Sequence, residues 1–429
     1  MPEDDRAGAP HDTAAKPTRA YVLHPDLKAA QSRRLPEHGL AEAVSLATAL
    51  PGLEVVGAEV VRLPKAQPGT LFGSGKVAEL AQRLEDIDLV LVDGPVTPVQ
   101  QRNLEKEWGV KLLDRTGLIL EIFADRARTR EGVLQVELAA LSYQRTRLVR
   151  AWTHLERQRG GFGFVGGPGE TQIESDRRAI DEQVIRIRRQ LEKVVRTREL
   201  HRAARRKVPF PVVALVGYTN AGKSTLFNRM TGAEVLAKDM LFATLDPTMR
   251  GVELPTGMKV ILSDTVGFIS DLPTQLVAAF RATLEEVLEA DLILHVRDIA
   301  HPESAEQAAD VGDILTSLGV DPKVPMFEVW NKLDLVSATI REQLVEQDRH
   351  GIFPVSALTG EGIEPLLRAV TDALDAERLT ETIPVAFADG RGRAWLHEEG
   401  VVTAEEQTAD GYDVTVNWTT RQKARYLAL

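Results

Sequence analysis

The segment from Gly217 to Ser224 constrains this chain more than any other feature. It reads GYTNAGKS and fits the pattern G-x-x-x-x-G-K-[ST], in which the backbone N–H groups of a loop surround phosphate oxygens. An apolar run at 212–216 precedes the loop and is typical of a strand buried on both faces, and residues 224–230 can begin a helix. The sequence therefore predicts a strand, a phosphate-binding loop and a helix whose N-terminus faces an anion.

Two side chains of this loop have expected chemical roles. The Lys223 ammonium can reach the outer phosphates of a nucleotide, and the Ser224 hydroxyl can bind Mg²⁺. A glycine-rich surface turn with an exposed lysine is the alternative, which the flanking apolar run disfavours. The residues predicted to contact a nucleotide here are Gly217, Tyr218, Thr219, Asn220, Ala221, Gly222, Lys223, Ser224 and Thr225.

The composition excludes several classes of protein. With 429 residues and a hydrophobic fraction of 43%, the chain is long enough for several domains with apolar cores. It has no cysteine, which excludes disulfides, thiolate metal sites and cysteine nucleophiles and fits a reducing compartment, so we expect a cytoplasmic protein. No run approaches about 18 apolar residues, and residues 1–19 are polar; we expect no membrane span, no signal peptide and a disordered tail.

Residues 20–125 alternate between strand-like and helical runs, which is the rhythm of a parallel α/β sheet. The strand-like runs are 53–63, 89–92 and 110–113, and the helical ones are 40–50, 76–84 and 98–108. Thr97 before Pro98 is typical of a helix start. Gly73 to Lys76 also precedes a helix, but Thr70 stands where a phosphate loop needs its first glycine, so we expect an ordinary capped turn rather than an anion site.

Residues 126–208 carry two heptad stripes separated by a glycine-rich loop. The first stripe is Leu134, Leu138, Leu141, Leu148, Trp152 and Leu155, and the second is Ile173, Arg177, Ile180, Val184, Ile187, Leu191 and Val194. Two such helices most simply form an antiparallel hairpin with the loop at its tip. The loop holds Phe162 and Phe164, which either stack on unpaired bases or pin the hairpin tip.

The second arm of this hairpin is strongly basic, although the whole chain has a net charge of −11. From Arg186 to Lys207 there are ten lysines and arginines against two acids. Such a run is either a solvated helix face or a contact surface for a phosphate backbone, and we expect contact with RNA. The arginines expected to bind RNA are Arg188, Arg189, Arg205 and Arg206.

Residues 209–380 carry further motifs behind the phosphate loop. A polar segment that can change state precedes a predicted hairpin, and it consists of Phe242, Ala243, Thr244, Leu245 and Asp246. A D-x-x-G motif then follows the apolar strand at 260–262, and it consists of Asp264, Thr265, Val266 and Gly267. At this spacing the aspartate can stand behind Mg²⁺, and the glycine N–H can meet the γ-phosphate.

Two later motifs are typical of base recognition. Asn331, Lys332, Leu333 and Asp334 follow a predicted strand at 326–330, and Ser356, Ala357 and Leu358 follow another at 352–355. The Asp334 carboxylate can accept hydrogen bonds from N1–H and the exocyclic amine of guanine. Adenine offers neither group and would leave the carboxylate unpaired. Four ordered motifs in one domain therefore predict a guanine-nucleotide site.

These motifs resemble those of the HflX family of translation-factor-related GTPases. Beyond the shared elements, the resemblance rests on residues 128–132, 160–174, 242–246 and 264–269, and it spans residues 23–379. It implies a GTP-hydrolysing switch that binds the large ribosomal subunit and its rRNA and splits stalled ribosomes. It also implies that Ser224 and Thr244 bind Mg²⁺, with Thr248 as the competing threonine, and that Lys223, Thr244, Gly267 and Asn220 serve hydrolysis.

The residue after the D-x-x-G glycine sets an expectation for the rate of hydrolysis. In many related switches a glutamine there orients the attacking water, whereas Phe268 has no polar atom. We therefore expect slow intrinsic hydrolysis, with help from a partner or from a monovalent cation. Related GTPases that use potassium carry an asparagine at the place of Asn220, so the resemblance implies K⁺ as a second cofactor.

Residues 381–429 have strand-like runs at 385–387 and 412–418 around a helical run at 391–399, which predicts a small α+β domain. The fold class expected for the whole chain is multidomain α/β, with a mostly parallel sheet in the GTPase domain, and we expect a monomer. Two other functions stay open: an ATP-dependent RNA-remodelling enzyme with a second nucleotide site in the N-terminal domain, and a GTP-dependent scaffold that binds no RNA.

Overall fold

The computed structural model contains two compact units, Met1–Ile119 and Leu120–Leu429. It describes residues 16–27, 34–158, 168–205, 210–233, 241–245, 247–270, 272, 286–346, 350–376 and 378–427. Most of the predicted tail at 1–19, and the hairpin loop with Phe162 and Phe164, lie outside these residues. No helix in the described ranges has both the length and the apolar character needed to cross a membrane.

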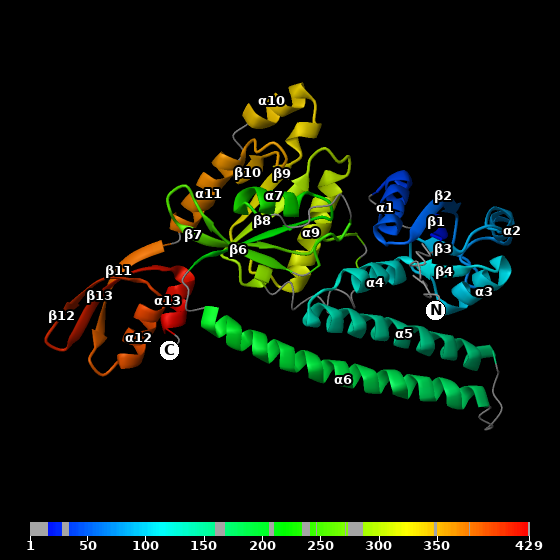
Figure 1. Cartoon of the computed structure of the whole chain (residues 1–429), viewed down its shortest axis with the longest axis horizontal. Coiled ribbons are helices and arrows are strands. Elements are labelled where there is room, and N and C mark those ends of the chain that lie inside the picture. The colour runs from blue at the N-terminus through cyan, green and yellow to red at the C-terminus, as the bar shows by residue number, and fades with distance from the viewer. Residues whose placement is uncertain are drawn as a thin grey trace, which may run out of the picture. The chain divides into compact units, whose positions relative to one another are not determined.

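The first unit contains a four-stranded parallel sheet in the order β2-β1-β3-β4 (Figure 1). Its strands are β1 (Thr18–Leu27), β2 (Leu53–Leu63), β3 (Leu89–Val92) and β4 (Lys111–Asp114), connected by the helices α1 (Pro36–Ala49), α2 (Ser74–Arg83) and α3 (Pro98–Trp108). This confirms the predicted parallel sheet, but β1 is not among the predicted strand-like runs, and it begins at Thr18, inside the segment 1–19 expected to be disordered; its pairing with β2 and β3 orders it. Thr97 caps α3 as expected: its hydroxyl accepts from the Gln100 N–H, and the Gln100 side chain accepts from the Thr97 N–H.

The turn before α2 is an ordinary helix start. Gly73 is the N-cap, and the Lys76 ammonium lies 3.2 Å from a Glu59 carboxylate oxygen and 2.9 Å from one of Glu79. Because two carboxylates already neutralise this lysine, the turn does not present a free positive charge to an anion. The helix start is ordinary, as expected, although no side chain caps it.

A buried ionic network in the first unit has no sequence pattern that predicts it. Arg115 donates to Asp93 at 2.6 Å and to Glu42 at 2.5 Å, and the His24 imidazole lies 2.7 Å from the same aspartate. Burial alone would raise the pKa of Asp93, but the charge of Arg115 and the hydrogen bonds outweigh burial and lower it. The network ties α1 and three of the strands together at the carboxyl end of the sheet.

The helical hairpin follows α4 (Arg115–Arg126) and consists of α5 (Arg130–Gln158) and α6 (Pro168–Arg205), which lie side by side (Figure 1). On α6, Val184 and Ile187 are buried as the second heptad stripe predicts. Arg177, which the stripe also included, is exposed, because its guanidinium stays in water near the loop end of the helix. The side chains of Leu148, Trp152, Leu155 and Ile173 lie outside the described residues.

The second sheet has six strands in the order β10-β9-β8-β5-β7-β6. They are β5 (Val212–Gly217), β6 (Thr248–Glu253), β7 (Lys259–Asp264), β8 (Leu292–Asp298), β9 (Met326–Asn331) and β10 (Ile352–Pro354), and all neighbours except the hairpin β6–β7 are parallel. The helices around this sheet are α7 (Lys223–Thr231), α9 (Ser304–Leu318), α10 (Ala338–Glu346) and α11 (Ile363–Ala376). The loops after β5, β7, β9 and β10 meet at one edge of the sheet, where α/β proteins bind their ligands.

The last part of the chain is a three-stranded antiparallel sheet in the order β11-β13-β12. It comprises β11 (Arg378–Ala386), β12 (Val402–Gln407) and β13 (Gly411–Thr419), with α12 (Gly390–Glu398) and α13 (Thr420–Leu427). Val414, Val416 and Trp418 alternate along β13 and are buried with Leu396 of α12. The predicted α+β module is confirmed, although the expected boundary at 381 falls inside β11, because that strand pairs with β13 from Arg378 onward.

Candidate functional site

The predicted phosphate loop connects β5 to α7. At Gly217 an added Cβ would lie 2.2 Å from the backbone oxygen of Val296, and at Gly222 it would lie 2.2 Å from the side-chain nitrogen of Asn331. Gly222 also has a φ of +90°, a backbone conformation that disfavours residues with a side chain. The close approach of the loop to β8 and β9 therefore requires both glycines of the motif.

Lys223 points back under this loop from the first turn of α7. Its side chain is buried, and its ammonium donates to the carbonyl oxygens of Tyr218 at 2.8 Å and Gly217 at 3.2 Å. Burial lowers the pKa of Lys223 to about 8, although the nearby charge of Asp264 raises it. An anion in the loop would favour the charged ammonium, so this lysine is suited to a phosphate ligand.

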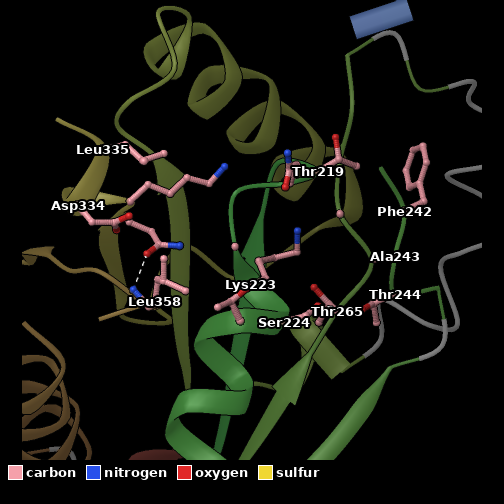
Figure 2. A pocket seen from close by; sticks show the side chains of 17 residues that line it. Thr219, Lys223, Ser224, Phe242, Ala243, Thr244, Thr265, Asp334, Leu335 and Leu358 are labelled. Atoms are coloured by element: carbon pink, nitrogen blue, oxygen red, sulfur yellow. Dashed lines mark hydrogen bonds between the residues drawn. The ribbon is translucent and has the colours of Figure 1, made fainter. Parts of the chain in front are cut away.

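Three oxygen-bearing side chains from three segments meet beside Lys223, and Figure 2 shows two of them, Ser224 and Thr244. The Ser224 hydroxyl donates to Asp264 Oδ2 at 2.7 Å, and the Thr244 hydroxyl donates to the same oxygen at 3.1 Å. The two hydroxyl oxygens are 2.8 Å apart. Burial raises the pKa of Asp264, while the hydrogen bonds from both hydroxyls and the charge of Lys223 lower it.

This cluster fits a hard divalent cation such as Mg²⁺, which prefers oxygen ligands. Asp264 Oδ1 is buried and has no hydrogen-bond partner among the described residues, so its capacity to accept a hydrogen bond is unfilled. The two hydroxyls would hold the ion, with the carboxylate behind them. Thr248, the competing threonine, begins β6 and is paired with Asp264 in the β6–β7 ladder.

The D-x-x-G segment is fastened to the phosphate loop by backbone hydrogen bonds. The Thr219 N–H donates to the Phe268 carbonyl at 2.7 Å, and the Phe268 N–H donates to the Gly217 carbonyl at 3.1 Å. A Cβ at Gly267 would lie 2.9 Å from Thr219 Cα, so only glycine fits there without displacing the loop. The Phe268 ring is buried and presents no polar atom to the site.

Tyr218 adds a side-chain bond to this attachment, which sequence reasoning missed. Its phenolic oxygen accepts from the Ser270 N–H at 2.9 Å and donates to the Ser270 hydroxyl at 3.1 Å. The motif pattern leaves its second position free, so only the folded geometry assigns Tyr218 this role. The residue thus couples the phosphate loop to the segment that follows Gly267.

Asn331 joins the base-recognition motifs to the phosphate loop. Its side-chain nitrogen donates to the Ala221 carbonyl at 2.8 Å, and its oxygen accepts from the Ala357 N–H at 2.9 Å. Asp334 accepts from the Ser356 hydroxyl at 2.5 Å, which orients its carboxylate beside the site. Two motifs that are separated in sequence therefore form one side of the site.

A cavity of about 480 Å³ lies between these two sides (Figure 2). Leu335 and Leu358 border it at the Asp334 end and are 66% and 68% exposed, a placement that suits the two faces of a planar base. Arg229 of α7 donates to the Ala357 carbonyl at 3.1 Å and also bonds that of Leu358, which fixes the second loop. Neither Leu335 nor Arg229 belongs to a recognised motif, so the sequence alone did not identify them.

Most of the predicted nucleotide contacts line this cavity. The predicted residues that do so are Thr219, Asn220, Gly222, Lys223, Ser224, Thr225, Phe242, Ala243, Thr244, Thr265, Gly267, Asn331, Lys332, Asp334, Ala357 and Leu358. Leu245, Val266 and Leu333 do not line it, and their apolar side chains are buried. The prediction also named Gly217, Tyr218, Ala221, Asp264 and Ser356, which are not among the lining residues either. Asp246 lies outside the described residues.

Asn220 has a structural reason for its identity as well as a chemical one. It is exposed at the rim of the cavity and its φ is +60°, in the left-handed region that asparagine tolerates better than most residues. The local backbone therefore explains an asparagine here without any ligand.

The basic arm is only partly described. Arg188 and Arg189 are exposed on α6, with Ile187 buried beside them. Arg205 ends that helix, its side chain is not described, and Arg206 lies outside the described residues. These two exposed arginines share this stretch of α6 with Ile185, an apolar side chain that is 50% exposed.

Comparisons with known proteins cover almost the whole chain. Family models match residues 37–124 (GTP-binding GTPase N-terminal), 126–205 (GTP-binding GTPase Middle Region) and 212–332 (50S ribosome-binding GTPase). The GTPase HflX of Magnetococcus marinus is 52% identical over 94% of this chain and 92% of its own length. That of Escherichia coli K12 is 45% identical over 80% and 81%.

Among solved structures, the complex of SsGBP with GDP is 24% identical and covers 83% of this chain and 98% of its own, with a TM-score of 0.48. The high identity to curated relatives over most of the chain, rather than this weaker likeness, shows the family. The chain belongs to the HflX family of GTPases.

Proposed function

We propose that this GTPase acts as a switch that binds the large ribosomal subunit through rRNA and separates stalled ribosomes. The observation that carries the ribosomal part is the exposed basic face of α6 in a chain whose net charge is −11. The family model at 212–332 supports it, because its description is a 50S ribosome-binding GTPase. With the ribosome as partner, the proposed compartment is the cytoplasm, and the proposed state is a monomer.

In the proposed mechanism, the protein positions GTP and places positive charge around its outer phosphates. The loop N–H groups and the Lys223 ammonium hold these phosphates, and the Gly267 N–H faces the γ-phosphate. The hydroxyls of Ser224 and Thr244 would hold Mg²⁺, while Asp264 accepts hydrogen bonds from both. Bound Mg²⁺ supplies positive charge that offsets the negative charge on the phosphates.

Asp334 is proposed to select guanine, since its carboxylate lies at the base end of the cavity and is already oriented by Ser356. Asp334→Asn should reduce the preference for GTP over ATP by about 2 kcal/mol, because the amide leaves a donor of guanine unpaired. Competition binding with GTP, ATP and xanthosine triphosphate measures this preference. The xanthine nucleotide should gain affinity, because its C2 oxygen can accept from the new amide.

The matched control is Asp313→Asn, which alters an exposed carboxylate on α9. It should leave all three affinities unchanged. If Asp334→Asn retains the full preference for GTP, the base-selecting role of Asp334 is wrong. If ATP is hydrolysed equally well before and after the change, the ATP-dependent alternative gains support.

The arginines of the basic arm are proposed to contact phosphates of rRNA. Reversing the charge of Arg188 and Arg189, and then also of Arg205 and Arg206, should weaken binding to large subunits. It should also reduce the slope of log affinity against log salt by about one for each lost phosphate contact. Binding measured by sedimentation over a salt series in a non-hydrolysable GTP analogue gives both quantities.

Reversing the charge of Arg368 and Arg391, two exposed arginines of α11 and α12, makes the same change in net charge elsewhere. Nucleotide affinity should stay the same in both sets, because neither pair lines the cavity. An unchanged salt slope in the hairpin variants would mean that these arginines make no phosphate contacts and that this arm is a solvated helix face. Absence of salt-sensitive RNA binding would favour the scaffold function.

Hydrolysis by the isolated protein should be slow, since Phe268 offers no group that orients water. We expect large ribosomal subunits to accelerate single-turnover GTP hydrolysis at least tenfold, which corresponds to about 1.4 kcal/mol of barrier. Small subunits at the same concentration are the control and should have little effect. Equal rates with and without large subunits would refute activation by this partner.

Potassium is proposed to add a smaller acceleration through the Asn220 amide. Hydrolysis should be faster in potassium than in sodium, and Asn220→Ala should remove the difference. Asn220→Gly is the matched variant, since glycine keeps the positive φ and also lacks the amide. Loss of the potassium effect in both variants assigns it to the amide, whereas loss in the alanine variant alone assigns it to the backbone.

A further inference from the structure

Phe242 has an unusual backbone for its residue type. Its φ is +56°, in the left-handed region, where an aromatic residue is an outlier because its Cβ is crowded and it has no local hydrogen bond to offer. Its side chain is only 2% exposed. Such a conformation persists when the surrounding structure holds it, and it is concentrated at functional sites.

The ring that packs on Phe242 comes from outside the nucleotide-binding fold. Phe123 of α4 meets it edge to face, with ring centroids 4.6 Å apart and an interplanar angle of 83°. Phe123 is itself 1% exposed. It belongs to the compact unit Leu120–Leu429, yet it is part of the region matched by the N-terminal family model at 37–124.

The held residue lies two positions before Thr244. Leu241 and Leu245, which flank residues 242–244, are buried as well. Apolar side chains therefore anchor the segment 241–245. Figure 2 shows Phe242 on the same side of the cavity as Ala243 and Thr244, across from Lys223. The orientation of this backbone therefore sets where the Thr244 hydroxyl lies, which is 2.8 Å from that of Ser224.

We propose that Phe123 is a positioning residue for Thr244: its ring keeps Phe242 in the left-handed conformation and thereby places the Thr244 hydroxyl in the Ser224–Asp264 cluster. This rests on the proposed role of Thr244 as a Mg²⁺ ligand when GTP is bound. It assigns to α4 a direct influence on the triphosphate state, because Thr244 would hold the Mg²⁺ that offsets the charge of the phosphates.

Phe123→Ala tests this positioning through the difference between two nucleotides. It should raise the Kd of a non-hydrolysable GTP analogue in Mg²⁺ about tenfold, equal to about 1.4 kcal/mol, and change the Kd of GDP less than twofold. The Mg²⁺ concentration for half-maximal analogue binding should rise as well. An equal loss for GDP and the analogue would indicate general damage and would overturn the proposal.

Two variants separate positioning from loss of packing. Phe123→Leu keeps an apolar side chain without the edge-to-face contact, and it should show a smaller shift in the same direction. If thermal unfolding shows that Phe123→Ala is not folded, the same nucleotide affinities are measured with Phe123→Leu instead. Phe72→Ala, which removes a buried ring that packs on Trp108 in the first unit, should leave both nucleotide affinities unchanged.

A double-mutant cycle with Thr244→Ala shows whether Phe123 acts through the threonine. If it does, adding Phe123→Ala to Thr244→Ala should produce no further loss of analogue affinity. A full additional loss would overturn the positioning role. If Thr244→Ala itself leaves the Mg²⁺ dependence unchanged, Thr244 is not a Mg²⁺ ligand. If Thr244→Ala has its effect but the Phe123 variants have none, Thr244 keeps its proposed role and Phe123 does not position it.

Discussion

The burial of one ammonium group governs the design of the nucleotide site. Lys223 lies beneath the phosphate loop with two backbone carbonyls as hydrogen-bond acceptors and Asp264 as the nearby negative charge. Removing both charges from water is unfavourable, and their depressed and raised pKa values express that cost. A bound phosphate would stabilise the charged form of Lys223, and a divalent cation would stabilise the charged form of Asp264. The charges of the pocket therefore suit these two ligands.

Rigid connections hold the two ends of this pocket in register. Asn331 bonds both the phosphate loop and the loop after β10, and Arg229 reaches that second loop from α7. The phosphate end is joined to the D-x-x-G segment by backbone bonds and by Tyr218. The distance between the base end and the phosphate end is therefore set by hydrogen bonds across the sheet edge rather than by loop length.

The segment that carries Thr244 is held by different forces. Apolar packing around Phe242 keeps a strained backbone in place, whereas the opposite wall is held by hydrogen bonds. Packing contacts of this kind can be released by a modest displacement of α4, while backbone hydrogen bonds within the sheet edge are costlier to break. The Thr244 side of the pocket is therefore the more easily displaced of the two.

The sequence by itself determined the parts whose physics is local or periodic. Alternating strand-like and helical runs predicted the parallel sheet of the first unit, Thr97 and Pro98 predicted the start of α3, and the spacing of glycines with Lys223 and Ser224 predicted the phosphate loop. Only the tertiary structure decided contacts between residues that are distant in sequence. These include the Arg115 network, the Arg229 bonds to the second base loop and the Phe123–Phe242 pair. None of these contacts has a local sequence pattern, because the residues near an arginine or phenylalanine in sequence do not indicate its distant partner. Only chain folding brings the two side chains together.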